Sequence, residues 1–437
     1  MRRRTTELGL LVLAAVITAA AYALASLGKS ATLPANLVPL LVVILGLLAV
    51  AHLAVRRLAP AADAVLLPCA GLLNGIGYVF IARLNPHLSG LQATWTALAV
   101  AAFVGTLLVV RRARDLERYR YSFMLLGIGL LLMPLLPVLG ENINGARLWV
   151  RFGSLTFQPG ELAKIAVSVF FASYLVERSE LLADIGHGHL PSLRVLGPVL
   201  LAWGVSLLVM TAERDLGSSL LFFALFISML WVATDRPAYL AIGAGLFAVG
   251  SLFAYRAFAH VRIRVTIWIN PWPHAANIGY QLLQGLFALG SGGFGGSGLG
   301  LGTPNVIPAA ATDFIFAAIG EELGLLGTAA IVVAFLVMVG VGLRIALRAD
   351  NPFEKLLAAG LTTILGLQSF IIIGGVLRLL PLTGITLPFV SYGGSSLLAN
   401  YILLALLLRI SNDNAERHQR AAAEEARVAE ETRIGAA

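Results

Sequence analysis

Charge and cysteine are what this sequence has least of. Only 12% of its 437 residues are charged, while 58% are hydrophobic and the mean hydropathy is +0.87. Soluble domains average about 25% charged and about 45–50% apolar residues, so this composition excludes a soluble enzyme, a nucleic-acid-binding protein and a disordered chain. The composition predicts a polytopic membrane protein, because the chain holds many apolar stretches of the length that crosses a bilayer.

The chain also lacks the patterns of several common sites. Cys69 is the only cysteine, so no internal disulfide can form, and no Cys/His cluster suits a structural zinc site. Among the seven histidines only His187 and His189 are closely spaced, and we expect them to be solvated in a cytoplasmic loop. The glycine-rich run from Gly290 to Gly302 lacks the Gly-Lys-Ser/Thr of a P-loop, and no Ser-His-Asp set is visible. No metal-binding residue is therefore assigned.

Apolar segments predict an all-α polytopic membrane protein with about twelve transmembrane helices. The expected spans lie near residues 8–27, 36–54, 64–82, 91–110, 122–139, 162–176, 195–211, 215–233, 238–258, 313–343, 356–377 and 388–408. With twelve spans both termini lie on one side, and 21 of the 31 Lys and Arg residues fall on that side. The positive-inside rule then places both termini in the cytoplasm. The net charge of +8 is explained by basic cytoplasmic loops, and no nucleic-acid partner is expected.

Three regions follow from this topology. Residues 1–63 form a basic cytoplasmic end and two helices, and residues 64–410 form the main body. Within the body, residues 259–312 form a large external loop whose aromatic and basic residues predict contact with membrane lipids at the interface. Residues 411–437 form a charged cytoplasmic tail, expected to be a solvated helix or disordered.

Ionisable residues at the outer ends of the spans are the functional candidates, because charge inside a membrane costs several kcal/mol. Glu161 and Lys164 share one helix face at i and i+3, either as a structural ion pair or in contact with a substrate. Asp215 precedes a span as a helix N-cap or a functional acid. Asp313 lies at the start of another span. The sequence leaves two roles equally open for it, as a helix cap or as a catalytic carboxylate.

Two further sets of charges accompany these acids. Glu321 and Glu322 lie about two turns deeper than Asp313, where we expect neutralised or hydrogen-bonded groups with a packing role. Several external cations could hold phosphates, since arginine binds them bidentately. These candidates are Arg147, Arg151, Lys164, Arg262 and Arg264. Acids, cations and an interfacial loop on the outer face together suit a substrate with a pyrophosphate head and a lipid tail.

Five strings in this order resemble the SEDS family (shape, elongation, division and sporulation), of the RodA/FtsW type. The strings are NGARLWVRFGSLTFQPGELAK (Asn144 to Lys164), RDLGSS (Arg214 to Ser219), GYQLLQGLFALGSGG (Gly279 to Gly293), TDFIFAAIGEELG (Thr312 to Gly324) and LPLTGITLPFVSYGGSS (Leu380 to Ser396). The family core has ten spans, so the first two helices look like an N-terminal addition. That addition, with 3 Lys against 28 Arg, is similar to actinobacterial RodA-type members.

The resemblance implies a glycosyltransferase that polymerises lipid II on the outer face of the bacterial plasma membrane, in cell elongation or division. It implies that Asp313 is the essential catalytic residue, which we interpret as the general base of an inverting transfer with an undecaprenyl-pyrophosphate leaving group. Substrate-binding roles are assigned to matching or nearby positions. These are Trp149, Arg147, Arg151, Glu161, Lys164, Asp215, Arg262, Arg264 and Ser391.

The chain departs from the family pattern at several positions. Ala309 follows Pro308 where Glu is usual, Asn270 stands where Asp is usual, and Arg378 stands where Gly is common. No cofactor is required by the sequence, and a divalent cation is left open as an alternative that the missing loop acids weaken. The family implies a class B penicillin-binding protein as partner. Two other functions stay open, a flippase for the lipid-linked precursor and a non-catalytic scaffold for a transpeptidase.

Overall fold

The computed structural model describes residues 2–30, 37–137, 139–143, 146–152, 155–183 and 215–435, with scattered positions between 197 and 208. The long helices are α1 (Arg2–Ser30), α2 (Leu37–Leu58), α3 (Leu66–Leu84), α4 (Pro86–Val109), α6 (Pro159–Ala183), α8 (Leu216–Thr234), α9 (Ala238–Ala257), α12 (Ile315–Leu347), α13 (Pro352–Val376) and α14 (Gly394–Gly435). The shorter helices are α5 (Arg120–Leu132), α10 (Ala259–Ile269) and α11 (Tyr280–Gly292). The single-turn or 3₁₀ segments are η1 (Ala113–Tyr119), η2 (Met133–Leu135), η3 (Trp272–His274) and η4 (Pro304–Val306).

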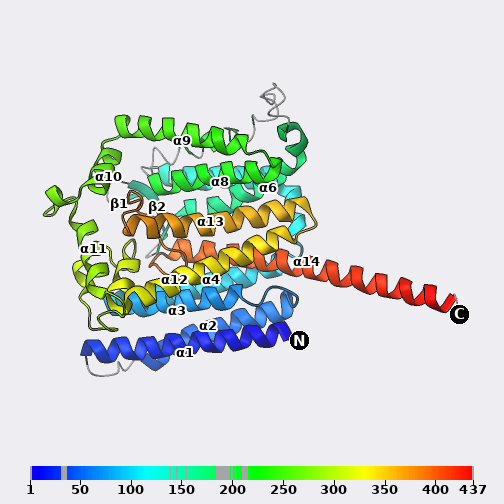
Figure 1. Ribbon diagram of the computed structural model, residues 1–437, viewed down its shortest axis with the longest axis horizontal. Coiled ribbons are helices and arrows are strands. Elements are labelled where there is room, and N and C mark those ends of the chain that lie inside the picture. Colours follow the sequence, from blue (N-terminus) through cyan, green and yellow to red (C-terminus); the bar gives the residue numbers. More distant parts are fainter. Residues whose placement is uncertain are drawn as a thin grey trace.

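The long helices form a bundle in which α1 and α2 lie along one side and α9 along the opposite side (Figure 1). Within the described residues, ten helices are long and apolar enough to cross a membrane. Of the twelve expected spans, 195–211 falls mostly outside the described residues. The span expected at 122–139 was too long, because α5 ends at Leu132 and Pro134 in η2 cannot continue the helical hydrogen bonding. The chain is an integral, multi-pass membrane protein.

A small antiparallel sheet accompanies the predominantly helical architecture that the sequence predicted. Strands β1 (Gly140–Ile143), β2 (Ala146–Phe152) and β3 (Leu155–Phe157) pair in the order β1-β2-β3. Strand β2 alternates Arg147, Trp149 and Arg151 with apolar residues, and its Val150 is fully buried. This period of two is the pattern of a strand with one covered face.

The segment expected as one external loop is ordered into α10, η3, α11 and η4. Together with the sheet, α10 and α11 lie at one end of the bundle, opposite the end that holds the N-terminus and from which α14 projects (Figure 1). Helix α14 continues through the residues expected as a separate tail. Ala, Glu and Arg favour helix there, and pairs such as Arg427–Glu424 at 2.8 Å support it.

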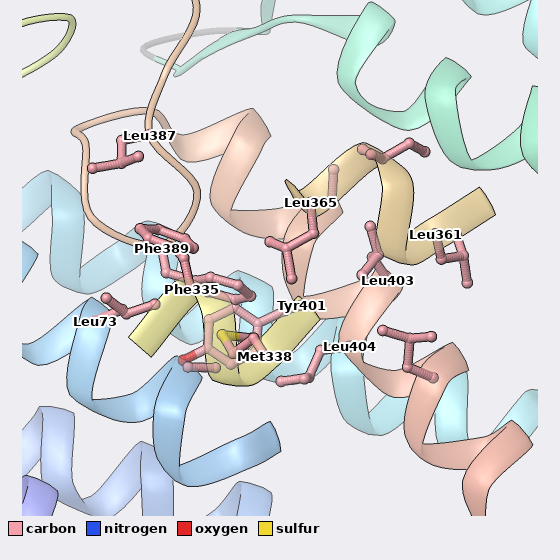
Figure 2. Close-up of a cluster of buried hydrophobic side chains, with 14 of the residues drawn as sticks. Leu73, Phe335, Met338, Leu361, Leu365, Leu387, Phe389, Tyr401, Leu403 and Leu404 are labelled. Carbon is pink, nitrogen blue, oxygen red and sulfur yellow. The ribbon is translucent and has the colours of Figure 1, made fainter. Parts of the chain in front are cut away.

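Aromatic and aliphatic side chains from four segments close the centre of the bundle. Tyr401 of α14 is fully buried and packs edge-on against Phe389, with ring centroids 5.5 Å apart. Phe335 and Met338 of α12 and Leu73 of α3 surround this pair (Figure 2). The contact ties α14 to the Pro/Gly-rich segment 380–393, which carries part of the candidate site.

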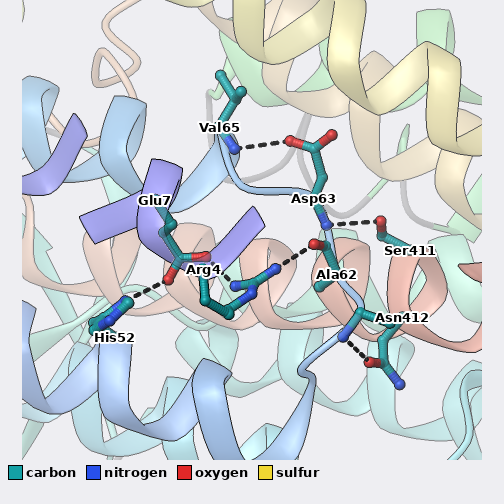
Figure 3. Close-up of polar contacts among 9 residues, drawn as sticks. Arg4, Glu7, His52, Ala62, Asp63, Val65, Ser411 and Asn412 are labelled. Carbon is teal, nitrogen blue, oxygen red and sulfur yellow. Dashed lines mark hydrogen bonds and ion pairs between the residues drawn. The ribbon is translucent and has the colours of Figure 1, made fainter. Parts of the chain in front are cut away.

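Polar contacts join α1 and α2 to the core at the end where the termini lie (Figure 3). Glu7 is completely buried, forms an ion pair with Arg4, and its Oε1 lies 2.7 Å from Nδ1 of His52. Arg4 also donates to the carbonyl of Ala62. The adjoining backbone N–H of Asp63 donates to Oγ of Ser411 at 3.0 Å. Helices α1 and α14 therefore both form hydrogen bonds with the segment that connects α2 to α3.

Candidate active site

Asp313 lies just before α12, at the end of the bundle that carries the sheet. The N-cap position of α12 is Phe314, and no side chain caps this helix. The capping alternative for Asp313 therefore has no support in the geometry. Its carboxylate instead approaches the turn around Gly384, where a Cβ would lie 3.8 Å from Oδ2 of Asp313.

Arg264 of α10 approaches the same point. A Cβ on Gly384 would lie 3.6 Å from Nη2 of Arg264, and the Gly384 backbone has φ +79°. Glycine is required here because the conformation is left-handed and because a side chain would fill the space beside both charged groups. Arg264 is oriented by a 2.8 Å hydrogen bond from Nη1 to the carbonyl of Leu382.

The two charges influence each other and the proton affinity of the site. Burial raises the pKa of Asp313 to about 6, although the charge of Arg264 and a hydrogen bond with Thr312 act in the opposite direction. Burial lowers the pKa of Arg264, and the carboxylates of Asp215 and Asp313 oppose that shift. Arg264 is thus electrostatically coupled to both acids.

Asp215 does cap a helix. It is the N-cap residue of α8, and its Oδ1 accepts the backbone N–H of Ser218 at 2.9 Å. Burial nevertheless raises the pKa of this carboxyl, while the hydrogen bond from Ser218 lowers it. Asp215 therefore serves as a cap and also belongs to the charge cluster around Arg264.

Glu161 and Lys164 form a buried ion pair in the first turns of α6. Nζ of Lys164 lies 2.9 Å from Oε2 of Glu161 and donates to Oε1 of Gln368 at 2.9 Å. Gln368 of α13 then donates from Nε2 to the carbonyl of Thr386 at 2.9 Å. This chain of contacts fixes the segment that holds Gly384. Gln368 was missed by the sequence analysis, although an amide inside an otherwise apolar span was a usable signal.

Ser391 holds that same segment against the residue before Asp313. Its Oγ donates to the carbonyl of Thr312 at 2.6 Å and accepts the N–H of Leu387 at 2.9 Å. The N–H of Tyr392 donates to the carbonyl of Ala311 at 2.8 Å. Ser391 is buried, and the two hydrogen bonds of its hydroxyl join the segment 380–393 to the residue before Asp313.

Trp149, Arg147 and Arg151 lie on one face of strand β2. Trp149 is directly opposite Glu141 across the β1–β2 pair, and Nε of the exposed Arg151 donates to Oε2 of Glu141 at 2.9 Å. Arg147 is also exposed. These cations are on the surface of the sheet, at the same end of the bundle as α10 and α11 (Figure 1).

Arg262 and Arg264 point to different faces of α10, since two residues along a helix turn the side chain by about 200°. Arg262 is exposed and donates to the carbonyl of Arg256 at 2.8 Å, one helix earlier in the chain. The structure therefore separates the expected set of cations: Arg264 lies with the acids, Lys164 is buried in its own pair, and Arg147, Arg151 and Arg262 are peripheral.

Glu321 and Glu322 accept hydrogen bonds from backbone N–H groups, as expected for a packing role. Oε1 of Glu322 lies 2.9 Å from Nε of the buried Arg83, and its Oε2 accepts the N–H of Gly300 at 2.9 Å. Oε1 of Glu321 accepts the N–H of Thr303 at 2.7 Å. Arg83 was not singled out from the sequence, where it reads as an ordinary cation at a helix end.

The described part of the chain offers few side chains that are grouped to bind a metal ion. Within those residues no group of three or more His, Cys, Asp or Glu side chains is placed to hold an ion. The carboxylates of Asp215 and Asp313 both act on the charge of Arg264.

Comparison with known proteins supplies the context for this site. The FTSW_RODA_SPOVE family model, described as a cell cycle protein, matches residues 77–416. Proteins named peptidoglycan glycosyltransferase RodA from Mycobacterium tuberculosis are 45% identical over 425 residues, covering 94% of this chain and 91% of theirs. A probable peptidoglycan glycosyltransferase FtsW from Geobacter metallireducens is 36% identical over 340 residues, covering 77% of this chain and 85% of the relative.

Solved structures resemble the same fold. A chain from a peptidoglycan synthase complex, described as coordinating polymerization and crosslinking, superposes with a TM-score of 0.68 at 26% identity, covering 81% of this chain and 98% of its own length. The rod shape determining protein RodA of Thermus thermophilus gives a TM-score of 0.59 at 26% identity, with the same coverage. The chain therefore belongs to the FtsW/RodA/SpoVE family of membrane proteins.

Proposed function

We propose that this protein polymerises lipid II into glycan strands at the outer face of the bacterial cell membrane, with Asp313 as the general base. The chain is a peptidoglycan glycosyltransferase of the RodA/FtsW type, on the strength of relatives with that name that are 45% identical over 94% of its length. The observation that carries the residue assignment is the approach of Asp313 and Arg264 to the same glycine, Gly384.

The reaction that suits these groups is an inverting glycosyl transfer. A sugar hydroxyl of the acceptor attacks the anomeric carbon of the strand held on undecaprenyl pyrophosphate. The new C–O bond forms as the bond to pyrophosphate breaks, and the hydroxyl proton passes to the carboxylate of Asp313. With a pKa of about 6, Asp313 is mostly ionised at neutral pH and close to the value that favours proton transfer there.

Positive charge stabilises the leaving pyrophosphate as the bond breaks. Arg264 is a cation beside the base, because the side chains of both residues reach Gly384. Its Nη1 is held by Leu382, which leaves other guanidinium N–H groups to face a substrate. Lys164 is buried and paired with Glu161 and Gln368, so its part is to fix the shape of the site. The exposed Arg147 and Arg151 on the sheet are suited to guide the anionic lipid head toward the site.

A class B penicillin-binding protein is the partner we propose. The similar chain in the peptidoglycan synthase complex supports this assignment, since that complex joins polymerization to crosslinking. We expect such a single-pass transpeptidase to co-purify with this protein and to raise its rate of polymerisation. An unchanged rate in the presence of every candidate transpeptidase would contradict the partnership.

The function is tested with purified protein and lipid II, in the absence of any other polymerase. The account predicts glycan strands, visible by gel electrophoresis of the labelled product. A flippase would move lipid II across vesicles and make no polymer. A scaffold would do neither by itself.

A further inference from the structure

Helix α1 lies outside the family match at residues 77–416, yet it is packed into the molecule along its length. Its Thr18 meets Gly75 of α3 so closely that a Cβ on Gly75 would lie 2.1 Å from the threonine Oγ1. Tyr22 packs edge-on against Tyr78 of α3, with ring centroids 6.2 Å apart. Helix α1 is therefore an integral part of the bundle as well as a membrane span.

The last turns of α1 touch the glycine-rich run that follows α11. A Cβ on Gly28 would lie 2.2 Å from the carbonyl oxygen of Leu299, and a Cβ on Gly300 would lie 2.3 Å from the carbonyl oxygen of Ala25. The two backbones approach at distances that only glycine allows, and Gly300 also has a left-handed φ of +80°.

The other side of this run is held by Glu322 of α12 and by Arg83 of α3. Glu322 accepts the N–H of Gly300 at 2.9 Å, and Nη2 of Arg83 donates to the carbonyl of Gly302 at 2.7 Å. Lys29 of α1 completes the arrangement, because its Nζ donates to the carbonyl of Arg83 at 3.0 Å. The run therefore lies between α1 and α12, the helix that begins two residues after Asp313.

A second route joins α1 to the site through α3. Gly77 faces away from Gly75 and α1, since two residues turn a helix by about 200°. A Cβ on Gly77 would lie 2.3 Å from the carbonyl oxygen of Val390. Val390 precedes Ser391, whose hydroxyl holds the carbonyl of Thr312. Helix α3 thus lies between α1 and the turn that supports Asp313.

We propose that α1 is a positioning element for Asp313, acting through the contact of Gly28 and Lys29 with the segment 297–303 and Arg83. This inference rests on the proposed function, because it assigns α1 to the geometry of that reaction. A helix that served only to anchor the chain in lipid would not need glycine at these close approaches.

The test compares full-length purified Gly28→Leu with Gly9→Leu as the matched control. Gly9 is in the same helix with no atom within 4 Å of an added Cβ, so leucine fits there. We expect amides of residues 297–303 to exchange with deuterium about tenfold faster in Gly28→Leu than in wild type or the control. With lipid II, kcat should fall about tenfold or more at unchanged KM, because small displacements near a reacting group are costly.

A second pair of variants covers the case in which Gly28→Leu does not fold. Lys29→Met removes the donor to Arg83 and should show the same faster exchange and lower kcat, whereas Lys29→Arg keeps a donor and should restore both. Unchanged exchange, or faster exchange with normal kcat, would overturn the inference. Absence of any glycan from wild-type protein would instead contradict the proposed function, and the exchange measurement would still decide whether α1 holds the segment.

Discussion

Arg264 and the two acids Asp215 and Asp313 form a site in which burial and local contacts shift each pKa in opposite directions. Burial raises the pKa of each carboxyl and lowers the pKa of the guanidinium. The charge of Arg264 opposes the shift of Asp313, the two carboxylates oppose the shift of Arg264, and hydrogen bonds from Ser218 oppose the shift of Asp215. Asp313 is thereby left with a pKa of about 6, which suits a group that must accept a proton near neutral pH.

The first prediction is a pH dependence. Asp313 accepts a proton only when ionised, so kcat/KM should be level above neutral pH and fall as the pH drops through about 6. Below that value the fall should approach about tenfold per pH unit, as for titration of a single base. Arg264→Met should move the inflection to higher pH, because the guanidinium charge lowers the pKa of Asp313. A flat profile between pH 5 and pH 8 would contradict the assignment.

The second prediction concerns the ion pair Glu161–Lys164, whose members are 4% and 3% exposed. Lys164→Met leaves Glu161 buried without its cation, so the free energy of unfolding should fall by about 3–5 kcal/mol. The double variant Glu161→Gln with Lys164→Met removes both charges and should recover most of that loss. Thermal unfolding in detergent measures both. Normal stability of Lys164→Met with lost activity would instead indicate direct contact between Lys164 and the substrate.

At the residue scale, the sequence identified candidate site residues, but it did not show which of them lie together. The spacing of Glu161 and Lys164 predicted a shared helix face, and the pair is present. The sequence could not distinguish Arg262 from Arg264, because only the packing of α10 decides which one faces the acids. Gln368 and Arg83 were missed because their partners, Lys164 and Glu322, are distant in the chain.

Among the elements, the segment 380–393 does the most to set the site. It has no regular secondary structure around Gly384, and it is held by Gln368 at one point and by Ser391 at another. The contacts of this segment come from α10, α13 and the approach to α12, and local sequence does not predict them. The small sheet was missed for a different reason, since the alternation in β2 spans only seven residues between much longer apolar runs.

The third prediction tests this segment. Ser391→Ala removes the hydroxyl that joins the N–H of Leu387 to the carbonyl of Thr312. Each buried backbone group left unpaired costs about 1–3 kcal/mol, and Asp313 loses a neighbouring support. We expect lower stability and lower kcat with little change in KM. Ser395→Ala is a comparison variant in the next helix, where the hydroxyl accepts the N–H of Gln158 at 2.7 Å. A raised KM in Ser391→Ala at normal kcat would favour the original assignment of Ser391 to substrate binding.

Over the whole molecule, the site and the termini lie at opposite ends of the bundle. The sheet, α10 and α11 gather at one end, and the N-terminus and the projecting part of α14 are at the other (Figure 1). Composition and apolar runs predicted a polytopic helical membrane protein, because an apolar run of sufficient length indicates a membrane-spanning helix. Exact span ends were less predictable, as α5 shows, because a proline can end a helix inside an apolar run.

The fourth prediction is the orientation of the bundle in the membrane. The distribution of Arg places the termini in the cytoplasm, so the site should face outward, where the polymer is made. A reporter inserted after Arg114 should be cytoplasmic, and a cysteine introduced at Gly295 should react with an impermeant reagent added to intact cells. Cytoplasmic labelling at Gly295 would place the acids on the wrong side for this reaction.

The most direct measurement of the central claim compares Asp313→Asn with wild type in polymerisation of lipid II by purified protein. Asn keeps nearly the shape of Asp, and Asp313 caps no helix, so folding should be near normal, as circular dichroism and thermal unfolding can verify. Loss of a general base costs about 10²–10⁴ in rate, so the account predicts polymer formation close to background. Polymerisation by Asp313→Asn at the wild-type rate would contradict the assignment of Asp313 as the base.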